Sequence, residues 1–156
     1  MKYYAVIDTN VLVSAMLKHH SVPGSIIDLA FDGPIIPILN DAIEKEYREV
    51  LSRPKFHLPS DLIEDILSSF HQRGFYVDAE KLDIELPNPK DRVFYEVVME
   101  ERKEEDAYLV TGNIKHFPEK PYIDSIRAFL KAKPIPEGKR YALSSPGSGR
   151  NCSGIV

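Results

Sequence analysis

Residues 3–16 have the sequence YYAVIDTNVLVSAM, in which a short apolar run meets a polar triplet and then a second apolar pattern. The run from Tyr3 to Ile7 is rich in β-forming residues and stops at Asp8, which is typical of a buried strand. The triplet Asp-Thr-Asn offers side chains that cap helices, and the apolar residues after it have the i, i+1, i+4, i+5 spacing of a helix. The stretch therefore predicts a strand that passes directly into a helix, with Asp8 at the junction.

The same alternation of strands and helices continues to about residue 131. Further strands are expected at 35–39, 74–77, 107–111 and 122–123, and further helices at 25–31, 41–51, 60–73, 90–102 and from 124 or 125 onward. Pro37 lies inside the second strand, which favours an edge position or a short strand because proline cannot donate to the ladder. Strands separated by helices in this way predict a mostly parallel sheet that is covered on both faces.

The length of 156 residues suits one domain. We expect that domain to cover residues 1–131, and we expect 132–156 to be a weakly ordered extension. After Lys131 the chain contains three prolines, four of its eight glycines and a serine-rich segment, which provide no core of their own.

Cysteine usage and charge narrow the class of protein. The single cysteine, Cys152, excludes an internal disulfide, and neither a secretory signal nor a membrane span is recognisable, so we expect a cytoplasmic protein. Twenty basic and 24 acidic side chains give a formal net charge of −4. This balance argues against a bulk electrostatic grip on nucleic acid, but it leaves open an enzyme whose acidic cluster holds metal ions.

Acidic and amide side chains gather where the predicted strands end. In parallel α/β sheets, ligands bind outside the carboxyl ends of the strands. Asp8 ends the first strand, Asp91 opens a helix after a proline-rich turn, and Asn113 follows the strand 107–111. On the helix 41–51, Glu46 and Glu44 lie on the two margins of the apolar stripe, so periodicity alone does not choose between them.

Four sequence pieces resemble, in order and spacing, the motifs of PIN-domain nucleases, with the toxin components of prokaryotic toxin–antitoxin pairs as the most similar branch. The resemblance covers about residues 3 to 130. It is carried by VIDTNVLVSA at 6–15, EYREVL with RPKF at 46–56, NPKD at 88–91, and LVTGN with HFP at 109–118.

The resemblance implies a three-layer α/β/α sandwich with a mostly parallel central sheet and an acidic pocket that binds Mg²⁺ or Mn²⁺ to hydrolyse single-stranded RNA. It also implies a homodimer and an antitoxin partner. Relatives carry a further acid at the position of Asn113 or three residues later, at that of His116. The implied catalytic residues are Asp8, Glu46, Asp91 and Asn113, with the first three as metal ligands and with Thr9, Asn10 and Thr111 in support. Cations that are candidates for phosphate contact are Arg48, Arg53, Lys55, Arg92 and Lys115.

Each of these residues also has a purely structural interpretation. Asp8 is a common helix cap, Glu46 a solvated helix residue, and Asp91 a partner of the helix dipole. Asn113 tolerates a turn, and His116 is by default a surface histidine. Two other functions remain open: a phosphatase that uses Asp8 as its nucleophile, and a degenerate nuclease fold that binds RNA or protein without cleaving.

Overall fold

The computed structural model describes residues 2–18 and 21–132, so the predicted extension 132–156 lies, except for its first residue, outside the described part. Within these ranges five strands form one sheet in the order β3-β2-β1-β4-β5, and every pairing is parallel. The strands are β1 (Tyr3–Ile7), β2 (Ile35–Leu39), β3 (Phe75–Tyr76), β4 (Ala107–Thr111) and β5 (Ile123–Ser125). Because all strands run in one direction, their carboxyl ends share one edge of the sheet.

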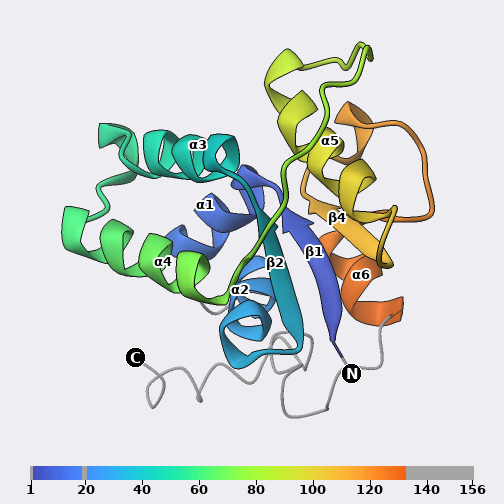
Figure 1. Ribbon diagram of the computed structural model, residues 1–156. Coiled ribbons are helices and arrows are strands. Elements are labelled where there is room, and N and C mark those ends of the chain that lie inside the picture. Colours follow the sequence, from blue (N-terminus) through green and yellow to red (C-terminus); the bar gives the residue numbers. More distant parts are fainter. Residues whose placement is uncertain (1, 19–20, 133–156) are drawn as a thin grey trace.

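Helices cover both faces of this sheet. They are α1 (Thr9–Leu17), α2 (Val22–Asp32), α3 (Asp41–Leu51), α4 (Ser60–Arg73), α5 (Arg92–Glu101) and α6 (Ile126–Ala132), with short 3₁₀ turns η1 (Pro54–Phe56), η2 (Pro89–Asp91) and η3 (Ile114–His116). Helix α5 packs on β1, β2 and β4, whereas α2 packs on β2, α6 on β4 and β5, and α2 and α6 touch. Figure 1 shows α3 and α4 side by side at the β2 flank of the sheet. The predicted α/β/α sandwich is therefore confirmed.

The central strands are the most deeply buried part of the chain. Ala5, Val6 and Ile7 of β1 have no exposed surface, as expected for a strand with neighbours on both sides and helices on both faces. The junction predicted from the first sequence stretch is also present, since α1 begins at Thr9, one residue after Asp8.

Three details differ from the expectations. Strand β2 contains Pro37 but is as long as β1 and β4 and lies inside the sheet, not at its edge, and its register with β3 begins at Ile38, one residue after the proline. Strand β3 is limited to Phe75–Tyr76. Helix α2 begins at Val22, earlier than predicted, because the Ser21 hydroxyl accepts a hydrogen bond from the Gly24 N–H at 3.2 Å.

The last helix begins at Ile126 rather than at 124 or 125, because those two residues belong to β5. In the part of the chain that the structure describes, no helix is both long and apolar enough to cross a membrane.

Candidate active site

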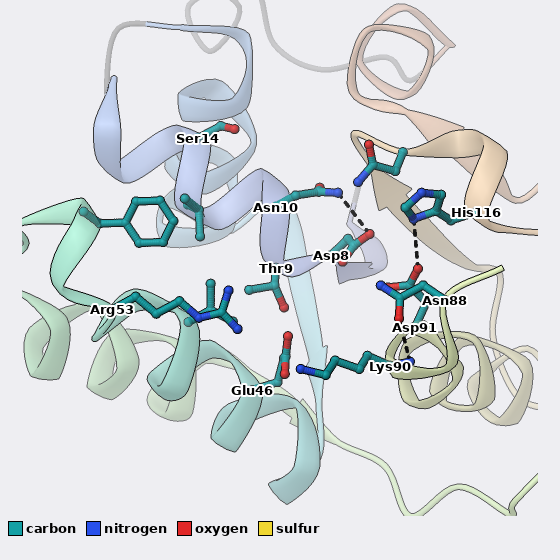
Figure 2. A pocket seen from close by; sticks show the side chains of 14 residues that line it. Asp8, Thr9, Asn10, Ser14, Glu46, Arg53, Asn88, Lys90, Asp91 and His116 are labelled. Carbon is teal, nitrogen blue, oxygen red and sulfur yellow. Dashed lines mark hydrogen bonds and ion pairs between the residues drawn. The ribbon is translucent and has the colours of Figure 1, made fainter. Parts of the chain in front are cut away.

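A pocket of about 400 Å³ opens at the carboxyl edge of the sheet, over the end of β1. Its walls come from α1, α3, the turn η2 and the turn after β4, so segments far apart in sequence meet there (Figure 2). The predicted site residues that line it are Asp8, Thr9, Asn10, Glu46, Arg53, Asp91 and Asn113. It is further lined by Val13, Ser14, Val50, Phe56, Asn88, Lys90 and His116.

Asp8 is held by side chains rather than used as a helix cap. Its Oδ2 accepts a hydrogen bond from the Thr111 hydroxyl at 2.7 Å and one from the Asn10 amide at 3.4 Å. The side chain makes no capping bond to α1, so the structural interpretation of this residue does not account for it. Burial, together with the negative charge of Asp91, raises the pKa of Asp8 to about 6, against the opposing effect of the Thr111 hydrogen bond.

Asp91 is a second buried carboxylate in the same pocket. It ends the turn η2, immediately before α5, and makes no capping hydrogen bond to that helix. Its Oδ2 lies 3.1 Å from Nδ1 of His116 (Figure 2). Burial raises the pKa of Asp91, and the contact with His116 acts in the opposite direction. His116, expected to be a surface histidine, is thus a partly buried partner of a candidate metal ligand.

Glu46 forms the opposite wall of the pocket and is positioned by its neighbour in sequence. The Tyr47 side chain is fully buried, and its hydroxyl donates to the Ile7 carbonyl at 2.5 Å, which ties α3 to the end of β1. Burial and the nearby Glu49 raise the pKa of Glu46, while Lys90 and Arg53 lower it. In Figure 2 the Lys90 ammonium points toward the Glu46 carboxylate.

The choice between Glu46 and Glu44 is decided by tertiary contacts. Glu44 lies on the other side of α3, where its Oε1 accepts a hydrogen bond from the Tyr76 hydroxyl and is 3.1 Å from Nδ1 of His71. It does not line the pocket, whereas Glu46 does. The structure therefore brings Glu46 together with Asp8 and Asp91.

The turn after β4 connects the supporting residues. The Gly112 N–H donates to Oδ1 of Asn10 at 3.0 Å, and the Asn113 N–H donates to the Thr111 hydroxyl at 2.9 Å. A Cβ at Gly112 would lie 3.2 Å from Oδ1 of Asn10, which favours glycine at this close approach. Asn113 itself has φ −123°, a value open to any residue, so the turn gives no reason for an asparagine there.

The predicted phosphate-contacting cations are placed differently from one another. Only Arg53 lines the pocket, where it also lies 3.7 Å from Glu49. Of the others, Arg48 pairs with Glu64, Lys55 lies over the Phe56 ring, Arg92 donates to the Ile84 carbonyl, and Lys115 is exposed in η3.

Two of the pocket residues not assigned to the site from the sequence have ionisable side chains, Lys90 and His116. Lys90 is adjacent to Asp91 in the NPKD motif, and His116 occupies the position at which relatives carry an acid. Adjacency and motif position were the signals that could have identified them.

A divalent cation needs several donor atoms placed close together. Among residues 2–18 and 21–132, no three His, Cys, Asp or Glu side chains are grouped closely enough to hold an ion together. Mg²⁺, however, is usually held by one or two carboxylates, with water and substrate phosphates completing its shell. Asp8 and Asp91 fit that need. The buried Oγ1 of Thr9, which has no hydrogen-bond partner among the described residues, is a further free oxygen at the pocket.

A parallel α/β/α fold with buried acids at the carboxyl edge of the sheet does not by itself identify an activity. The PIN domain family gives the narrower assignment, because it matches residues 4–115, and the chain belongs to this family. The family is one of nucleases that generally use divalent metal ions.

The chain is similar to the uncharacterized protein MJ1680 of Methanocaldococcus jannaschii, to which it is 28% identical over 116 residues that cover 72% of each chain. No solved structure matches the chain significantly.

Proposed function

We propose that this protein is a metal-dependent endoribonuclease that cleaves single-stranded RNA. Asp8 and Asp91 would hold the metal ion, and Glu46, the third predicted ligand, lines the same pocket and would join the ligand shell through water or substrate. The observation that carries the proposal is the pair Asp8 and Asp91. Two buried carboxylates from different elements share one pocket, and the charge of Asp91 contributes to the raised pKa of Asp8. A cation between them would relieve both their burial and their repulsion.

Mg²⁺ or Mn²⁺ is the proposed cofactor, because carboxylate and hydroxyl oxygens suit these ions. When bound, such an ion would acidify a water molecule and neutralise charge that develops on the phosphate. The preference for RNA is supported by the resemblance of the sequence motifs to the toxins of toxin–antitoxin pairs.

The residues around the carboxylates have positioning roles in this proposal. Thr111 and Asn10 hold Asp8 in one orientation, and His116 does the same for Asp91. Asn113, which lines the pocket, would complete or orient the ligand shell through its amide.

The cations Arg53 and Lys90 lie on the Glu46 side of the same pocket. Their charged groups can contact the phosphates of a bound RNA strand. They would thus offset the negative charge that the three carboxylates present to an approaching nucleic acid.

A metal titration with a cleavage assay tests the proposal. We expect cleavage of an end-labelled single-stranded RNA with Mg²⁺ or Mn²⁺, none with a chelator, and little on DNA of the same sequence. Asp8→Asn should lower the rate by orders of magnitude, because it removes a charged ligand while it preserves the shape. Undiminished cleavage by this variant would overturn the mechanism.

The proposed partners are a second copy of the chain and an antitoxin segment that blocks the pocket. An arginine or lysine of the antitoxin entering beside Asp8 and Asp91 would supply the positive charge that the metal otherwise brings. Purification of the native complex tests this, with its stoichiometry measured by ultracentrifugation. A partner that binds far from Asp8 and Asp91 would contradict the proposed antitoxin segment. A monomeric nuclease would contradict the proposed homodimer.

A further inference from the structure

A second cavity of about 470 Å³ lies at the same edge of the sheet. It is formed by the carboxyl ends of β4 and β5 and by the beginning of α2, where Thr111, Ser125 and Val22 line it. This edge is the side of a parallel sheet on which ligands bind. The cavity is separate from the candidate active site, which lies over β1. The two have no lining residue in common, although both use residues of the turn after β4.

The turn after β4 separates the two cavities. Asn113 lines the active-site pocket, and the next residue, Ile114, lines the second cavity. Gly112, whose N–H donates to Oδ1 of Asn10, also lines the second cavity. Consecutive residues of one turn therefore contribute to the walls of both cavities, which makes the cavities neighbours at the same edge of the sheet.

The lining of the second cavity differs in chemistry from that of the active site. Its apolar side chains are Val22, Pro23, Ile114 and Ile126, and 41% of the Ile114 surface is exposed. Arg127 supplies a positive charge, and none of the described residues that line the cavity is acidic. An apolar surface beside a cation complements a flat base that is attached to a phosphate, since unpaired bases are bound through their faces and phosphates through arginine.

We propose that this second cavity binds the base of a nucleotide that neighbours the cleaved bond, with Arg127 contacting its phosphate. The inference rests on the proposed RNA cleavage and adds a base-binding subsite to it. The absence of acids from the described lining disfavours a metal as the occupant. The position beside the active site, on the other side of the same turn, together with the apolar lining, favours a nucleotide over an acidic peptide.

An abasic scan tests the subsite directly. A single-stranded RNA that the protein cleaves is prepared as a set in which each member lacks one base. Dissociation constants are then measured by fluorescence anisotropy with Ca²⁺ in place of Mg²⁺, and gel electrophoresis checks that the strands remain uncut. Ile114→Ser should raise the Kd of the intact strand roughly three- to tenfold, because apolar contact with the base is lost.

The scan also identifies which base is bound. One abasic strand lacks the base that occupies the cavity, beside the cleavage site. The parent and the Ile114→Ser variant should bind this strand equally, because it has no base to contact Ile114. Arg127→Ala should weaken binding of every strand and lower the slope of log K against log salt by about 0.7. Leu62→Ser, which removes an exposed apolar side chain on α4, is the matched control and should change nothing.

Three results would overturn the inference. If Ile114→Ser binds every strand as the parent does while the parent cleaves RNA, the subsite is absent and the proposed function stands. If the parent neither binds nor cleaves RNA with Mg²⁺ or Mn²⁺, the proposed function fails and the subsite fails with it. An unchanged RNA affinity of Ile114→Ser, combined with loss of a co-purifying protein, would assign the cavity to a protein partner instead.

Discussion

Replacing Asp8 with asparagine is expected to stabilise the folded protein at neutral pH, although under the proposed function it should abolish catalysis. The residue is 4% exposed, and its pKa is raised from 3.8 to about 6. A shift of one pKa unit corresponds to about 1.4 kcal/mol. The raised pKa therefore means that the ionised Asp8 carboxylate lowers the free energy of unfolding by about 3 kcal/mol at neutral pH. The asparagine amide N–H groups also need acceptors among the same neighbours, which reduces the benefit. We therefore expect the free energy of unfolding to rise by about 1 to 3 kcal/mol.

The gain depends on pH in a defined direction. Below about pH 3.8 the carboxyl of Asp8 is protonated in both states and contributes no difference. As the pH rises toward about 6, the unfolded chain releases this proton first, so the stability contributed by Asp8 falls. Above pH 6 the full penalty is present, and the difference between Asp8→Asn and the parent is greatest.

Urea denaturation followed by circular dichroism, at several pH values between about 4 and 8, measures this difference. Asp106→Asn, at an exposed residue just before β4, is the matched control and should show no such trend. Saturating Mg²⁺ should raise the melting temperature of the parent more than that of Asp8→Asn, because only the parent retains the full ligand set. Equal or lower stability of Asp8→Asn at about pH 7.5 would refute the reasoning.

Three further predictions concern neighbouring residues. Asn113→Asp should lower the metal concentration for half-maximal cleavage and Asp91→Asn should raise it roughly tenfold or more; a titration of Asn113→Asp that overlays the parent's would remove Asn113 from the site. His116→Ala should weaken Mn²⁺ binding roughly tenfold in calorimetry, because Asp91 loses its orienting partner, and unchanged binding would contradict that role. Tyr47→Phe should lower the free energy of unfolding by about 1 kcal/mol in urea, through loss of the hydrogen bond to Ile7; no change would show that the bond contributes nothing.

The sequence predicted the fold well where local and tertiary preferences agree. The apolar run to Ile7, the break at Asp8 and the helix after it all favour one structure, and β1 and α1 form there. Pro37 was harder to interpret, because the effect of a proline depends on whether a neighbouring strand needs a hydrogen bond from its position. The pairing with β3 begins only at Ile38, so an interior strand accommodates the proline.

The site was less predictable, because its selection depends on contacts between distant segments. Helical periodicity places both Glu44 and Glu46 beside the apolar stripe. Tertiary contacts distinguish the two glutamates. Tyr76 on β3 binds Glu44, and Tyr47 ties the helix to β1 on the side of Glu46. Local sequence pattern did not separate His116 from an ordinary surface histidine, because its contact with Asp91 spans 25 positions of sequence, and only its position in the motif pointed to the site.

Incubation with a circular single-stranded RNA tests whether the protein is a metal-dependent endoribonuclease, because a strand without ends is opened only by an endonuclease. We expect the protein to open the circle with Mg²⁺ or Mn²⁺ and not with a chelator, and we expect Asp8→Asn to leave the circle intact. A circle that stays closed while linear RNA is degraded, or one that opens in the presence of chelator, would contradict this function.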